Sequence, residues 1–137
     1  MKQLNDDFIN RMPNFLRWIL VPFAIIIAHI VVNLFLQIIH FLNAGYIGAT
    51  LDSWFSWLNY FVVSPGVSTF ASVMAGVYVA PHYKFVTSLI IATLFILLSG
   101  TGIMMYTVLE TDYGMVLSML ASAIGAGVGV YQAKLDD

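Results

Sequence analysis

Four polar side chains follow one another along the first long apolar segment, at spacings of four, four and three residues. They are His29, Asn33, Gln37 and His40, and we call this set the polar stripe. At about 100° per residue of a helix, the four positions fall within an arc of about 80° on one face. Because a polar side chain in hydrocarbon is costly without a hydrogen-bond partner or water, we expect the stripe to face protein or a wet cavity.

Two interpretations of the polar stripe stay open at the level of sequence. In the first, its side chains make hydrogen bonds between helices, each of which contributes about 0.6 kcal/mol in membrane proteins. In the second, they line a hydrated path for ions, protons or a polar solute. Neither histidine has a carboxylate on its own segment, which weakens a proton relay.

Histidines in a small helical bundle also suggest haem, which needs two axial ligands at one depth. His29 lies about 14 residues into its segment, His40 lies near the far end, and His82 lies in a turn at the opposite end. Two histidines of one chain therefore cannot hold one iron, and we predict no cofactor and no metal site. The remaining haem alternatives are a pair across a subunit interface, or a histidine with Met74, Met104 or Met105.

Small residues recur every four positions in two later segments. These small-residue faces are Ala121, Gly125 and Gly129 in one segment, and Ser68, Ser72 and Gly76 in the other. Small residues allow two helices to approach closely. The neighbouring helix can belong to the same chain or to another chain, and the pattern favours neither.

A proline and a glycine interrupt the second apolar segment. Pro65 has no N–H and clashes with the carbonyl four residues back, that of Phe61, and Gly66 adds freedom. The part beyond them, residues 67–80, reaches about 21 Å as a helix, too short to cross a bilayer alone. We therefore predict one helix with a hinge at Pro65 and Gly66. Its first half carries an aromatic belt for a membrane interface: Trp54, Phe55, Trp57 and Tyr60.

The composition indicates the class of protein. Of the 137 residues, 61% are hydrophobic and 9% are charged, against about a quarter charged in ordinary soluble domains. Residues 18–51, 53–83, 85–109 and 113–133 carry no charge, and each run exceeds the roughly 20 residues that cross a bilayer. We predict an all-α, polytopic integral membrane protein with a single domain, 1–137. Its four transmembrane helices are expected at about 15–42, 54–80, 85–108 and 115–132, after a short interfacial segment, 1–14.

The basic residues predict the orientation of this bundle. All five fall on one side of the four predicted helices: Lys2, Arg11, Arg17, Lys84 and Lys134. The loops on the other side carry acidic residues only. By the positive-inside rule, both termini lie in the cytoplasm, and we expect the protein in the cell (inner) membrane.

Several classes of function are excluded. Without cysteine, thiolate chemistry and cysteine-ligated metals are ruled out. A net charge of −2 without a basic face argues against nucleic acid. No serine, threonine or histidine is placed with an acid in a triad-like set, so we predict no enzyme.

The function that remains is association within the lipid bilayer. We expect a homo-oligomer or an accessory subunit that docks onto a larger membrane protein through the small-residue faces. The alternative is a small oligomeric pore or membrane-perturbing effector, in which the polar stripe of the first helix lines a hydrated path.

Overall fold

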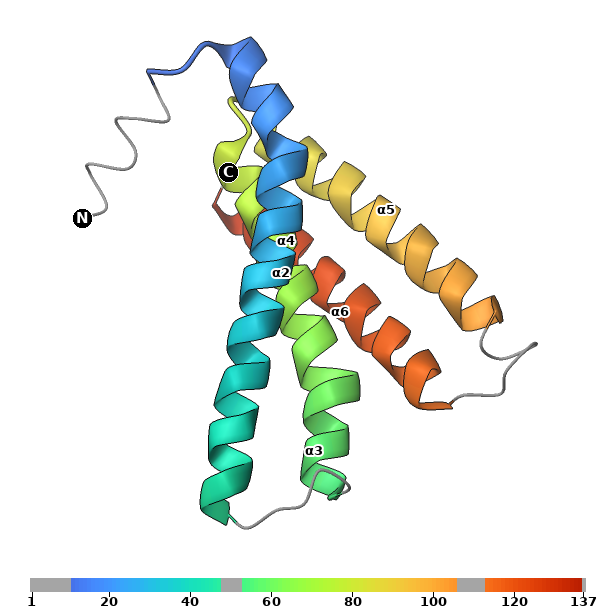
Figure 1. The fold of residues 1–137 in the computed structure, drawn as a ribbon. Coiled ribbons are helices and arrows are strands. Elements are labelled where there is room, and N and C mark those ends of the chain that lie inside the picture. The colour runs from blue at the N-terminus through green and yellow to red at the C-terminus, as the bar shows by residue number, and fades with distance from the viewer. Residues whose placement is uncertain (1–10, 48–52, 106–112, 137) are drawn as a thin grey trace.

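The computed structural model describes residues 11–47, 53–105 and 113–136, and its regular elements in those ranges are all helices. They are α2 (Asn14–Ile47), α3 (Trp54–Leu58), the π-helix η1 (Asn59–Val63), α4 (Ser64–Val79), α5 (Lys84–Met105) and α6 (Tyr113–Leu135) (Figure 1). Since α3, η1 and α4 form one continuous run, four helices are long and apolar enough to cross a membrane. The prediction of an all-α chain with four such helices is confirmed for the described residues.

The helices differ from the predicted ones mainly at their ends. Helix α2 continues to Ile47, whereas the sequence predicted a loop after residue 42. Gly45 does not end it, because one glycine in a helix costs only about 1 kcal/mol relative to alanine. Helix α6 exceeds the predicted 115–132 at both ends. The predicted end of the third helix at residue 108, and most of the interfacial segment 1–14, lie outside the described residues.

Helix α4 occupies the centre of the bundle, because α2, α5 and α6 all pack against it. Helix α5 also packs along α6, whereas α2 makes its extensive contacts with α4 alone. The N-terminal end of α2 and the C-terminal end of α6 lie at the same end of the bundle, with the turn between α4 and α5 (Figure 1). Helix α3, whose sequence contains Trp54, Phe55 and Trp57, lies at the opposite end (Figure 1).

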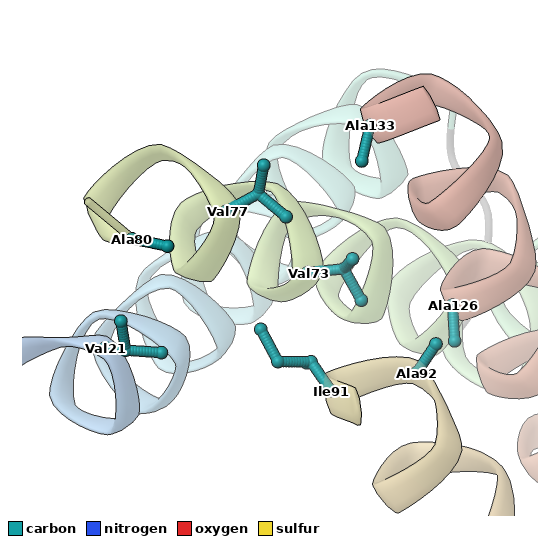
Figure 2. Close-up of a cluster of buried hydrophobic side chains, with 8 residues drawn as sticks. All are labelled: Val21, Val73, Val77, Ala80, Ile91, Ala92, Ala126 and Ala133. Carbon is teal, nitrogen blue, oxygen red and sulfur yellow. The ribbon is translucent and has the colours of Figure 1, made fainter. Parts of the chain in front are cut away.

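The hydrophobic core consists mainly of alanine and valine side chains from the four long helices. It consists of Val21, Val73, Val77, Ala80, Ile91, Ala92, Ala126 and Ala133 (Figure 2). Large apolar side chains face outward instead, as with Phe35, which is 61% exposed, and Leu98, which is 68% exposed. An apolar exterior around a core of small residues is typical of helices that pack in lipid, and it suggests a membrane protein.

A widened helical turn lies immediately before Pro65, where the sequence predicted a hinge. The π-helix η1 ends immediately before Ser64, whose N–H donates to the carbonyl of Asn59, five residues back. Pro65 then lies directly after η1, in the first turn of α4, and has no N–H to donate to the preceding turn of this continuous helix. The π-turn thus accommodates the proline within one continuous helix. Helix α6 packs against this turn.

Candidate functional site

His29, in the middle of α2, contacts two other helices. Its Nδ1 lies 3.2 Å from the Oγ of Ser72 in α4, and its ring stacks on Phe95 of α5 with centroids 6.0 Å apart. The Ser72 hydroxyl donates to the carbonyl oxygen of Ser68 at 2.6 Å. Since a hydroxyl has one hydrogen, His29 Nδ1 is the donor in its bond to Ser72. His29 therefore joins α2 to α4 through a polar contact.

Asn33 and Gln37, the next members of the polar stripe, bond to each other along α2. Gln37 Nε2 donates to Asn33 Oδ1 at 2.8 Å. Asn33 is half-buried and Gln37 is exposed. This bond leaves the amide nitrogen of Asn33 and the amide oxygen of Gln37 without a partner among the described residues. The middle of the stripe thus presents polar groups at the surface of an apolar helix.

His40, the last member of the stripe, contacts α3. Its Nε2 lies 3.1 Å from Ser56 Oγ, and its ring lies against Phe55 with centroids 5.7 Å apart. Ser53 donates to the same Ser56 hydroxyl at 3.2 Å. Ser53 is also the N-cap of α3, where its oxygen accepts the N–H of Ser56. His40 therefore fixes the start of α3 against the end of α2.

A pocket of about 630 Å³ opens between the end of α2 and the run formed by α3 and η1. Its polar lining is Gln37, His40, Ser53, Ser56 and Asn59. Two buried atoms that belong to lining residues, His40 Nδ1 and Asn59 Nδ2, have no hydrogen-bond partner among the described residues. Sequence analysis missed Asn59, because its place beside the polar stripe depends on how α3 and η1 fold back along α2.

The small-residue face of α6 lies against α4 of the same chain. A Cβ added at Gly125 would collide with the carbonyl oxygen of Gly66, and one added at Gly129 would lie 2.9 Å from the Cβ of Val73. Ala121 is buried, and its carbonyl oxygen would lie 3.3 Å from a Cβ added at Gly66. This face is occupied within the chain, so contact with another chain here would require α4 and α6 to separate.

The small-residue face of α4 is buried as well. Ser68, Ser72 and Gly76 all lie on its buried side. A Cβ added at Gly76 would lie 2.5 Å from Ile91 Cδ1 of α5 and 3.0 Å from Ile25 Cγ1 of α2, so Gly76 marks the point where both helices approach α4. The two small-residue faces therefore build the interior of the bundle.

Arg17, which the sequence analysis counted only as a positive charge, makes a specific contact with α4. The residue is 8% exposed. Its Nε donates to the carbonyl oxygen of Val79 and its Nη2 to that of Ala80, both at 3.0 Å. Carbonyls at a helix C-terminus lack intrahelical donors, and the helix dipole favours a cation there. Arg17 therefore caps α4 from a neighbouring helix, which sequence periodicity does not reveal.

The three histidines lie at separate levels along α2. His82 packs against Trp18 near the first turns of α2, with ring centroids 5.9 Å apart. His29 lies in the middle, and His40 lies near the other end, beside α3. Among the described residues, no three histidine or acidic side chains are grouped to hold a metal ion.

No protein-family model, no curated protein and no solved structure matches the chain. The fold and the site therefore define its class on their own. The chain is a helical bundle with four helices long and apolar enough to span a membrane. Polar contacts connect its first helix to its centre, and a partly polar pocket opens at one end.

Proposed function

We propose that the protein is a small integral membrane protein of the cell membrane that associates with other membrane helices, in copies of itself or in a larger complex. The observation that carries this proposal is the Asn33–Gln37 amide pair on α2. Part of this pair is exposed on a helix that packs extensively against α4 alone. In hydrocarbon, such amide groups favour contact with a polar group of a second helix.

The proposed docking surface differs from the one that the sequence suggested. The small-residue faces are used between helices of this chain. The outer side of α2 remains open, because large side chains before and within the amide pair, such as Ile30 and Leu34, are exposed. We therefore assign the association to α2.

Oligomeric mass tests this assignment. The double variant Asn33→Leu, Gln37→Leu, purified in mild detergent and reconstituted in nanodiscs, should have a lower oligomeric mass and weaker cross-linking than the wild type. Asn43→Leu is the matched control, because it removes another exposed amide of α2 outside the stripe. If the double variant and the control assemble like the wild type, the amide pair does not mediate association.

A pore is the second candidate function, and the same exposed amides favour it. In an oligomer, Asn33 and Gln37 of neighbouring copies would face a shared axis and keep it wet. If they line such an axis, the double leucine variant should assemble normally but lose ion flux in liposomes, because an apolar constriction excludes water. Lost assembly with no effect on flux supports docking instead.

We further propose that both termini lie in the cytoplasm. The basic residues Arg17, Lys84 and Lys134 belong to helix ends that gather at one end of the bundle (Figure 1), and this distribution supports the orientation. Because the chain contains no cysteine, single-cysteine variants can be labelled without background. In intact cells, an impermeant maleimide should label Asp112→Cys but reach Lys84→Cys only after permeabilisation. The reverse pattern contradicts the orientation.

A further inference from the structure

Helix α2 is the least buried of the four long helices. In its most apolar stretch 6% of the residues are buried, against 28–39% in the corresponding stretches of the other three candidate spans. Its packing is also one-sided, because it packs extensively against α4 alone, whereas α5 and α6 pack against α4 and against each other. A long face of α2 therefore has no helix beside it among the described residues.

Six positions on this open face follow one another at spacings of four, three, four, three and four residues. Such heptad spacing keeps one line of side chains facing a helix that runs alongside, as in left-handed coiled coils. Left-handed packing at a crossing angle of about 20° also predominates among transmembrane helices. The first four positions are apolar and 43–57% exposed. We call the six positions the α2 seam: Ile19, Phe23, Ile26, Ile30, Asn33 and Gln37.

The amide pair at the end of the seam is complementary to itself. The 2.8 Å bond from Gln37 Nε2 to Asn33 Oδ1 brings the two amide groups to one level of the helix. A donor, Asn33 Nδ2, and an acceptor, Gln37 Oε1, then remain without a partner among the described residues. Both are accessible, since Gln37 is exposed and Asn33 Nδ2 is not one of the buried unpaired atoms. Each copy of the chain thus offers the donor that the acceptor of another copy needs.

We propose that two copies of this chain associate through the α2 seam, as a symmetric dimer with parallel α2 helices. Copies inserted in one orientation have parallel helices, and a two-fold axis brings each seam residue beside its counterpart. Asn33 Nδ2 of each copy then donates to Gln37 Oε1 of the other copy, and the bond within each copy completes a closed ring. The inference rests on the proposed association at α2 and names its partner, a second copy of this chain.

The chemistry of the amide pair favours a second copy over the alternatives. Lipid tails offer neither a donor nor an acceptor. A different helix needs both a donor and an acceptor at this one level, whereas a second copy supplies both by symmetry. Polar side chains in an apolar seam fix the register of two helices, while the apolar positions supply the packing. Because donor and acceptor lie at one level, two copies are enough to close the ring.

Disulfide cross-linking at single positions tests the seam, because the chain contains no cysteine. Ile30 and Val31 form a matched pair, since they are adjacent, both β-branched, and 53% and 57% exposed. Only Ile30 belongs to the seam. In liposomes at low protein density, mild oxidation should link Ile30→Cys into a dimer but not Val31→Cys, whose Cα lies beyond the roughly 7 Å that a disulfide can bridge. Equal cross-linking of both variants, or cross-linking of Val31→Cys alone, overturns the inference.

Mixing two single variants tests the ring of hydrogen bonds. Asn33→Leu or Gln37→Leu removes both bonds between the copies, so either variant alone should dimerise about eightfold more weakly than the wild type. A mixed dimer keeps one bond, because one copy supplies Asn33 and the other Gln37, and it should be about threefold more stable than either same-variant dimer.

Energy transfer between copies labelled at Lys134→Cys, an exposed position, measures these affinities as the protein-to-lipid ratio is varied. Asn43→Leu, an exposed amide of α2 outside the seam, is the control and should dimerise like the wild type. Far-UV circular dichroism checks the fold of each variant, and the cysteine pair tests the seam independently of them. If the two leucine variants mix at random, the ring is overturned.

The outcomes distinguish this inference from the proposed association. Suppose that the purified chain is monomeric in liposomes, but that in cell membranes it forms a larger complex, which the double leucine variant loses. That result overturns the inference and leaves the association standing. If the double variant assembles like the wild type in both membranes, both are overturned. Particles of more than two copies in nanodiscs overturn the symmetric dimer alone.

Discussion

The close contact between α4 and α6 makes two neighbouring glycines respond oppositely to the same substitution. Gly125→Ala places a Cβ against the carbonyl oxygen of Gly66 and 2.9 Å from its carbonyl carbon. These are backbone atoms, which cannot rotate away. Gly127→Ala places a Cβ where no atom lies within 4 Å. We expect Gly125→Ala to destabilise the bundle and Gly127→Ala to leave it unchanged or slightly more stable.

The magnitude follows from the difference between the two positions. Forcing an extra methyl group into a filled contact costs about 1–3 kcal/mol. The gain in helix propensity from glycine to alanine, up to about 1 kcal/mol, applies to both positions and cancels in the comparison. The free energies of unfolding of the two variants should therefore differ by about 1–3 kcal/mol. Gly129→Ala, which meets the side chain of Val73 rather than backbone, should fall between them.

Titration of the protein in mixed micelles with increasing SDS measures these free energies, with circular dichroism and tryptophan fluorescence as readouts. Because the contact lies within one chain, the destabilisation by Gly125→Ala should not depend on protein concentration. Equal stability of the Gly125 and Gly127 variants would refute the close packing of α4 on α6. A difference that disappears on dilution would instead place the contact between chains.

Two further contacts can be tested in the same titration. Arg17→Leu should lower the free energy of unfolding by about 2–3 kcal/mol, because two charge-assisted hydrogen bonds to the end of α4 are lost. Arg17→Lys should cost less, and a neutral effect of Arg17→Leu would contradict the cap. In a double-mutant cycle, His29→Leu and Ser72→Ala should show a coupling of about 0.6 kcal/mol. Strictly additive effects would mean that their 3.2 Å contact contributes nothing.

Charge and periodicity were sufficient to predict the helices and the composition of their faces. The charge-free runs located four helices long enough to cross a membrane. The spacing of the polar stripe put His29 and His40 on one side of α2, where both contact serines of neighbouring helices. Pro65 and Gly66 predicted a hinge, and the structure has the π-turn η1 immediately before them, at Asn59–Val63. These features depend on local sequence, so a single chain is enough to infer them.

The spacing of residues along the sequence did not predict which helices contact one another. The pattern of Ala121, Gly125 and Gly129 allows an approach by any helix, and only the tertiary arrangement identifies α4 of the same chain. The sequence showed Arg17 only as a positive charge at a helix end. Its acceptors, the carbonyls of Val79 and Ala80, are more than sixty residues away along the chain. The identity of a partner is a tertiary property, and periodicity describes only one element at a time.

The hydrogen bonds along α2 differ between the two ends of the bundle. Near its first turns, Arg17 satisfies the carbonyls at the end of α4, and in the middle His29 bonds to Ser72. Between the middle and the far end, the buried polar atoms without a partner are His40 Nδ1, Asn59 Nδ2 and Ser64 Oγ, among the residues that the structure describes. Asn59 begins η1 and Ser64 follows it. Because unpaired buried polar groups are costly, the part of the bundle around this π-turn is less well satisfied in hydrogen bonds than the end that Arg17 caps.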